Sequence, residues 1–241
     1  MNQPPLQNLS AALLQRLRFE HDLGLDAVRP VPLEPVLSAS VDLVRVQPTA
    51  SATEKSKRWE ALEARALGCT RCVLHCGRTH VVFGDGNRQA RLVFVGEGPG
   101  ADEDRTGVPF VGKAGQLLNK IIGAMGLNRE DVYICNIVKC RPPENRTPRP
   151  DEMALCQPFL EEQLALIAPQ AIVALGSSAA MALLQTNTGI TQLRGHWRLY
   201  NGTHVMPTYH PAFVLRQYTE QIRRQVWDDM RLVMQYLKGS V

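Results

Sequence analysis

The 241-residue sequence lacks any uninterrupted apolar run long enough to cross a lipid bilayer. Its first residues, MNQPPLQNLSAALLQRL, also lack the basic start and long apolar stretch of a secretory signal. We therefore expect a cytoplasmic protein with no membrane partner. Charge of one sign does not dominate, since 27 Lys and Arg stand against 23 Asp and Glu, for a net charge of +4. This mildly basic balance is compatible with nucleic acid as a partner, but many enzymes without a polyanionic partner share it.

Two stretches of the chain differ in composition. Residues 1–57 contain a helix predicted over Leu9–Asp22, followed by a stretch rich in Pro, Ser and Thr that is typical of a linker. The remaining sequence, from about Ser56, alternates regularly between helical and strand patterns. We predict an N-terminal extension of unassigned role at 1–57 and one folded domain at 58–241.

The alternating patterns of the second stretch predict its architecture. Strands are predicted at 91–96, 132–140, 171–176 and 204–211, and helices at 56–68, 112–126, 151–169, 177–185 and 219–237. Such alternation predicts an α/β fold in three layers, α/β/α, around a central, mostly parallel sheet of four strands. Functional residues of such folds collect beyond the carboxyl ends of the strands. Those ends lie after Val95, Ile134, Leu175 and Thr208.

The first strand end is the segment VFVGEGPGADED, residues 93–104. Its glycines fit the dinucleotide fingerprint G-x-G-x-x-A. However, the acids at 102–104 would repel a pyrophosphate, and no acid follows about 20 residues later to hold a ribose. We predict no nucleotide cofactor. We predict instead that the backbone at Gly98 and Gly100 lies close against a flat ligand, with the Glu97 carboxyl beside it. A tight turn with a capping acid is the structural alternative.

The other strand ends each offer a candidate that also has an ordinary structural explanation. Phe110 stacks on a flat ring or fills the core. The Asn136 amide, with one acceptor and two donors, reads the exocyclic oxygen and ring N–H of a pyrimidine or caps the sheet edge. Ser177 opens a helix, where it seats a phosphate or serves as an N-cap. For His210 we favour a catalytic role, because the other three strand ends also carry polar or aromatic candidates.

Four of the six cysteines have the spacing of a metal site. Cys69 and Cys72 form a C-x-x-C pair after a helix, Cys140 precedes a proline-rich loop, and Cys156 lies on the following helix. A cytosolic chain seldom uses cysteines as disulfides. Four thiolates suit structural zinc or an iron–sulfur cluster equally well. Cys135 is expected to be a small core residue.

Five ordered motifs, GEGPGADED, TGVPFVGKAGQLL, NIVKCRPPENRTP, IVALGSSAA and MPTYHPAFVLR, closely resemble those of family 4 uracil-DNA glycosylases, the iron–sulfur class of bacteria and archaea. The resemblance runs from about Cys69 to the C-terminal helix and does not cover residues 1–57. It implies a uracil-DNA glycosylase-like fold for 58–241. It also implies that the four metal-spaced cysteines, Cys69, Cys72, Cys140 and Cys156, bind a 4Fe–4S cluster.

The resemblance implies an enzyme of base-excision repair, a hydrolase that acts on uracil in single- or double-stranded DNA. It flips deoxyuridine out of the stack, hydrolyses the N-glycosidic bond, releases uracil and leaves an abasic site. By the same resemblance Phe110 stacks on uracil, Asn136 reads its O4 and N3–H edge, and the Gly98 backbone meets O2. His210 donates a hydrogen bond to O2 as negative charge develops there. Glu97 positions water or stabilises the positive sugar.

Further roles follow from the same resemblance. Glu103 crowds the methyl group of thymine and so excludes normal DNA. Ser177 holds a phosphate, and either Val214 or Leu215 wedges into the gap left by the flipped base. Arg216 and the basic loop NRTPRP hold backbone phosphates, which makes binding salt-dependent. We expect a monomer in a bacterial cytoplasm, associated with the nucleoid.

The sequence also departs from related glycosylases. Family 1 enzymes carry a water-directing aspartate where this chain has Gly98, and a methyl-blocking tyrosine where it has Gly100. No basic, histidine-bearing insertion lies between Gly107 and Gly115, so we expect turnover and no covalent adduct with DNA. Two alternatives are a non-catalytic module that binds DNA or a repair partner, and a nucleotide-binding oxidoreductase with a redox cluster. The strand-end residues disfavour the first alternative, and the acids at 102–104 disfavour the second.

Overall fold

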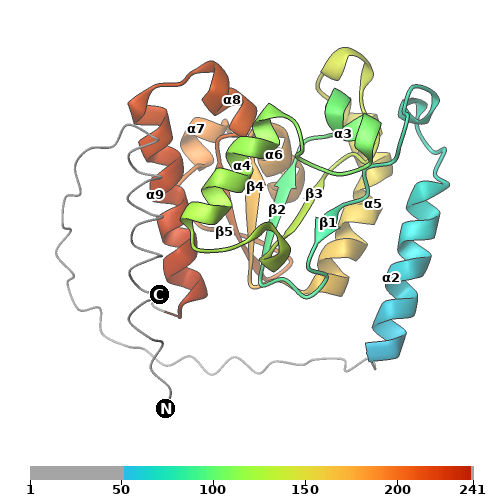
Figure 1. Ribbon diagram of the computed structural model, residues 1–241, viewed down its shortest axis with the longest axis horizontal. Coiled ribbons are helices and arrows are strands. Elements are labelled where there is room, and N and C mark those ends of the chain that lie inside the picture. Colours follow the sequence, from blue (N-terminus) through green and yellow to red (C-terminus); the bar gives the residue numbers. More distant parts are fainter. Residues whose placement is uncertain (1–51, 240–241) are drawn as a thin grey trace.

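The structure is a computed structural model that describes residues 52–239 (Figure 1). In this part of the chain the strands form one mixed sheet with the order β1-β3-β2-β4-β6-β5. The strands are β1 (Asp85–Gly86), β2 (Leu92–Gly96), β3 (Tyr133–Asn136), β4 (Ala171–Leu175), β5 (Arg198–Tyr200) and β6 (Thr203–Thr208). The helix predicted over Leu9–Asp22 and the linker after it lie outside the described residues.

The predicted four-stranded parallel sheet is confirmed as the centre of a six-stranded one. β2 pairs in parallel with both β3 and β4, and β4 pairs in parallel with β6. β1 and β5 add antiparallel edges next to β3 and β6. These two strands have only 2 and 3 residues, which is too short for a strand to show its alternation in sequence.

The helices surround this sheet (Figure 1). They are α2 (Ala52–Leu67), α3 (Ala101–Thr106), α4 (Lys113–Ala124), α5 (Pro150–Ile167), α6 (Ser177–Leu184), α7 (Ile190–Leu193), α8 (Pro211–Arg216) and α9 (Glu220–Leu237), with 3-10 turns η1 (Val73–Cys76), η2 (Arg129–Asp131) and η3 (Pro143–Asn145). The five predicted helices are confirmed, whereas α3, α7 and α8 are too short to have been predicted from periodicity. None of the helices within residues 52–239 has the length and apolar character needed to span a membrane.

Each face of the sheet has its own hydrophobic core, which confirms the three layers. Along β2, Val93 and Val95 face a core that includes α2, α5 and α6. Leu92 and Phe94 point to the opposite face, where α4, α8 and α9 complete a second core. This alternation follows from the period of two in a β-strand. All five residues of β2 are buried, as expected for a parallel strand covered on both sides.

Helix α2 joins the folded domain to the segment before it. The helix begins at residue 52, within the predicted extension, and packs against α5. Its Trp59, Leu62 and Ala66 are buried in the core. The Trp59 ring also makes edge-on contacts with Phe83 and Tyr133, at centroid distances of 5.9 and 5.5 Å. The boundary at residues 57 and 58 stays a prediction, but the described fold already includes residue 52.

Leu62→Ala tests whether α2 belongs to this core. Leu62 is 0% exposed, so the substitution should leave a cavity and lower the free energy of unfolding by about 2–5 kcal/mol. Leu67→Ala on the same helix is the matched control, because Leu67 is 52% exposed. Urea unfolding of both variants gives the comparison. Equal stabilities would mean that α2 is not part of the cooperative unit.

Candidate active site and cysteine cavity

Four parallel strands end together at one edge of the sheet, on the side of α3 and α8 (Figure 1). Glu97 follows β2 directly, Asn136 is the last residue of β3, Ser177 begins α6 just after β4, and His210 comes two residues after β6. The residue before Glu97 pairs in register with Asn136. The structure brings these four residues to the edge that the sequence predicted, and their roles in function stay a prediction.

Asn136 is an almost fully buried polar residue of this edge, with 1% exposure. Its Oδ1 is buried and has no hydrogen-bond partner among residues 52–239. An unsatisfied buried acceptor costs about 1–3 kcal/mol, so this atom is suited to accept a hydrogen bond from a ligand. A Cβ at Gly96 would lie 2.5 Å from that oxygen and 2.5 Å from Phe110 Cζ. Only glycine permits this approach.

Phe110 forms a wall of the site and also belongs to the core. It is 5% exposed and packs in the same core as α4. Its ring centroid lies 5.7 Å from that of His210, with the two planes inclined by 32°. Its backbone is left-handed, with φ of 53°, a conformation that is uncommon for a bulky residue. The core position offered as one explanation is confirmed, and the stacking role stays a prediction.

His210 is held as a neutral imidazole with a defined tautomer. Its Nδ1 accepts a hydrogen bond from the Ala212 backbone N–H at 3.1 Å, as N-cap of α8. An accepting Nδ1 leaves Nε2 as the N–H donor of the ring. Burial, and to a smaller extent the positive charge of Arg216, lower the pKa of His210 from 6.5 to about 4. At neutral pH the ring therefore offers a neutral hydrogen-bond donor.

Glu97 has a partner that sequence reasoning missed. The Ser178 hydroxyl, in the first turn of α6, donates a short hydrogen bond to Glu97 Oε2. The preceding Ser177, for which a phosphate contact is predicted, is exposed to solvent, and that role stays a prediction. The pair of serines in GSSAA was visible in the sequence, but only the direction of the helix decides which one points at Glu97.

The loop after β2 is fastened by Glu103. Its Oε1 accepts hydrogen bonds from the backbone N–H groups of Val111 and Gly112, both at 2.9 Å, and its Oε2 accepts one from Gly100 at 3.1 Å. These bonds tie the glycine-rich loop to the loop that carries Phe110. The proposed role of Glu103 against thymine stays a prediction, now with a structural role beside it. A Cβ at Gly98 would lie 2.7 Å from Val138 Cγ2, so this backbone lies closely against the segment after β3.

The residues expected to contact DNA differ in exposure. Leu215 is 40% exposed, whereas Val214 is 2% exposed and packs in the core. Leu215 is therefore the accessible one of the two wedge candidates, and the wedge role itself stays a prediction. Arg216 and Ser177 are exposed, as phosphate contacts require.

The four metal-spaced cysteines line one cavity. Cys69, Cys72, Cys140 and Cys156 surround a space of about 300 Å³, which includes the open region at its mouth. Within residues 52–239 no three His, Cys, Asp or Glu side chains come close enough to hold a single ion. The four thiols thus face one shared space, and the identity of the group that they bind stays a prediction.

Two N–H groups point at sulfur atoms of this cavity. Arg78 Nη1 donates to Cys140 Sγ at 3.2 Å, and the Lys139 backbone N–H donates to Cys156 Sγ at 3.3 Å. Arg78 also bonds the carbonyls of Leu67 and Cys69, so it joins three segments around the cavity. Hydrogen bonds to sulfur are a common second shell of thiolate-held clusters. Cys135 lies apart from the cavity in the core, as predicted, with 0% exposure.

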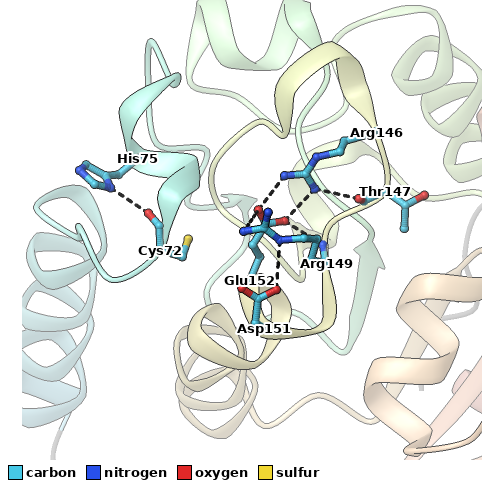
Figure 2. Close-up of polar contacts among 7 residues, drawn as sticks. All are labelled: Cys72, His75, Arg146, Thr147, Arg149, Asp151 and Glu152. Carbon is cyan, nitrogen blue, oxygen red and sulfur yellow. Dashed lines mark hydrogen bonds and ion pairs between the residues drawn. The ribbon is translucent and has the colours of Figure 1, made fainter.

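The loop between β3 and α5 is braced by a buried carboxylate (Figure 2). Arg146 bonds both oxygens of Glu152, at 2.8 and 2.7 Å, and the Arg149 backbone N–H donates to Glu152 Oε2 at 2.7 Å. The hydrogen bond from Arg146 is the main reason that the pKa of Glu152 falls from 4.5 to about 2. The guanidinium of Arg146 thus serves the fold, and phosphate binding by this loop stays a prediction for its other basic groups.

The family model of the uracil DNA glycosylase superfamily matches residues 83–231. The chain is 48% identical over 183 residues to the type-4 uracil-DNA glycosylase of Thermotoga maritima, covering 74% of this chain and 94% of that protein. It is 43% identical over 175 residues to the type-4 enzyme of Archaeoglobus fulgidus, covering 69% and 87%. With that of Saccharolobus solfataricus it shares 42% over 181 residues, covering 71% and 83%.

Ser178→Ala tests the bond to Glu97. Loss of a hydrogen bond to a carboxyl group should lower the single-turnover rate of uracil release roughly 10- to 100-fold, since such bonds contribute about 1.5–3 kcal/mol. Ser178→Thr keeps the hydroxyl and should recover most of the rate. A Ser178→Ala enzyme as fast as wild type would show that this bond does not matter for the reaction.

The pH dependence of uracil release tests the neutral His210. Because the pKa lies at about 4 in the folded protein, lowering the pH from 8 to 5 should give no inflection near the ordinary value of 6.5. The pKa of His210 is lower in the folded protein than the ordinary value of 6.5 in the unfolded chain, so the free energy of unfolding should also fall as the pH drops from 6.5 to 4. Single-turnover rates between pH 8 and pH 5 test the expected absence of an inflection. A loss of rate centred near pH 6.5 that disappears in His210→Gln would contradict the assignment.

Proposed function

Because the chain belongs to the uracil DNA glycosylase superfamily and removes uracil from DNA by hydrolysis in base-excision repair, we propose that the site at the strand ends holds the flipped base. A uracil within a duplex is out of reach of these buried groups, so it must leave the stack. The observation that carries the proposal is the buried, unpartnered Oδ1 of Asn136 at this edge.

Four residues contribute to uracil recognition. Phe110 stacks on the ring of the base. Asn136 Oδ1 accepts the N3–H of uracil, and its amide N–H donates to O4. Cytosine reverses this pattern, since it has an acceptor at N3 and an amino donor at C4, and both contacts would be lost. The backbone beside Gly98 meets O2, and Glu103 excludes thymine by occupying the place of its methyl group.

Bond cleavage leaves positive charge on the sugar and negative charge on uracil. The N1–C1′ bond breaks and its electron pair passes to the base. A water oxygen bonds to C1′, and the proton that this water loses is balanced by the proton that the released uracil anion takes up from solvent. His210 Nε2–H donates to O2 as that oxygen gains charge, which stabilises the leaving group without a proton transfer. Glu97, held by Ser178, orients the water and balances the positive sugar.

We propose further that Cys69, Cys72, Cys140 and Cys156 hold a 4Fe–4S cluster. When bound, the cluster supplies covalent cross-links between the end of α2, η1, the segment after β3, and α5. The cavity they share and the N–H groups aimed at two of their sulfurs support this assignment. The residues proposed for catalysis lie at the sheet edge and do not include these cysteines.

DNA binding is assigned to the surface around α8 and the start of α6. Leu215 fills the gap left by the base, while Ser177 and Arg216 bind backbone phosphates, so affinity falls as salt rises.

One chain supplies every residue proposed for the uracil site, and we propose that the protein acts as a monomer. Its DNA substrate places it at the nucleoid, in the cytoplasm.

Cleavage of a labelled oligonucleotide with one uracil, followed by alkali, tests the assignment. Cluster-loaded wild type should cleave at uracil and leave a matched thymine oligonucleotide intact. Asn136→Ala should reduce the rate at least about 100-fold, because the buried edge of the base loses its partner. Asn187→Ala, at an exposed loop position after α6, should match wild type. Undiminished cleavage by Asn136→Ala would reject this base-reading role.

A further inference from the structure

Phe110 is held in a backbone conformation that its own side chain disfavours. Its φ of 53° lies in the left-handed region, where a bulky residue persists only if the surroundings hold it. One side of this constraint is Gly115 in α4, where an added Cβ would lie 1.9 Å from the Phe110 carbonyl oxygen. The Phe110 backbone therefore rests directly on the helix. This contact with Gly115 does not by itself determine the direction of the Pro109 and Phe110 carbonyls.

Arg129 supplies the other side of the constraint. Its Nη2 donates to the Pro109 carbonyl at 2.5 Å, and its Nη1 donates to the Phe110 carbonyl at 3.2 Å. In an extended chain two successive carbonyls point to opposite sides. A helical or left-handed residue between them turns both to the same side, so one guanidinium can bind both only in a conformation such as the one observed.

The guanidinium is itself fixed in place. Its Nε bonds Asp85 Oδ2 at 3.0 Å, and Nη1 also bonds Asn119 Oδ1 at 3.1 Å. These anchors come from β1 and α4, so Arg129 joins both of these elements to the Phe110 loop. The planar fork of arginine can bind all these acceptors at once, whereas lysine offers a single point charge. The side chain is 23% exposed and lies outside the catalytic edge.

We propose that Arg129 is a positioning residue for uracil excision, which holds the Phe110 ring at the angle needed to stack on the flipped base. The inference rests on the proposed function of Phe110. Arg129 does not touch the base, and it acts only through the two carbonyls it binds. Without it, Phe110 relaxes to an ordinary backbone conformation and its ring leaves the site beside His210.

Arg129→Met in the cluster-loaded, full-length protein tests this. The single-turnover rate of uracil release at saturating enzyme should fall roughly 10- to 100-fold, as displacements near 1 Å can produce. The Kd for uracil-containing DNA should change little, because no phosphate contact is removed. Arg129→Lys should be intermediate. Gly115→Ala, which pushes the same carbonyl from the opposite side, should lower the rate in the same way.

Arg88→Met is the matched control for loss of an arginine. Arg88 pairs with Glu63 at 3.1 Å and lies over the Trp59 ring, away from the site. Its removal should change the rate by less than about twofold, as for most surface ion pairs.

Combination with Phe110→Ala separates positioning from general stability. In that background Arg129→Met should cost little further rate, because its effect passes through the missing ring. An equal loss in both backgrounds, or a wild-type rate for Arg129→Met while Phe110→Ala is slow, would overturn the inference. A wild-type rate for Phe110→Ala would reject the stacking function itself. A crystal structure of Arg129→Met provides a readout independent of activity: a Phe110 that kept its left-handed conformation would also overturn the inference.

Discussion

The side-by-side course of β2 and β3 past their last paired residues is the constraint on which the site depends. Beyond the strands, Ile137 N–H still donates to the Gly96 carbonyl at 3.0 Å, and Val138 N–H to the Glu97 carbonyl at 3.2 Å. Two backbones held this closely bring Glu97 and Asn136 to one place. A Cβ at residue 96 would push both Asn136 and Phe110 away from the end of β2. The close approach of these two side chains to the strand therefore depends on glycine at residue 96.

Lys139 joins this site to the cysteine cavity. Its buried ammonium donates to the Asn136 carbonyl at 2.8 Å and to Gln163 Oε1 at 2.6 Å. Burial lowers the pKa of the ammonium, and these bonds offset part of the cost of desolvation. The next residue is Cys140, and the Lys139 backbone bonds Cys156. Residues 136–140 thus run without interruption from Asn136 at the sheet edge to Cys140 at the cavity, and Lys139 contacts residues of both.

Several residues of the site have a strained backbone, or a polar group without its usual partner or charge. The Phe110 backbone is left-handed, the Asn136 oxygen lacks a partner within the described chain, and His210 is partly buried and uncharged. Each would be unfavourable in isolation and is held by its surroundings, as is common at functional sites. Glu103 shows the opposite case, since its carboxyl is fully used in tying two loops together.

Local patterns in the sequence determined the layers, the four parallel strands, the edge where the site lies and the cysteine framework, because these depend on periodicity and spacing. Only the tertiary structure decided which of two neighbouring residues makes a given contact or is exposed to solvent. Ser178 rather than Ser177 meets Glu97, and Leu215 rather than Val214 faces outward. Adjacent residues on a helix point about 100° apart, and only packing sets which of them faces the sheet. The contact of Arg129 with Phe110 spans 19 residues, a distance over which no local pattern carries information.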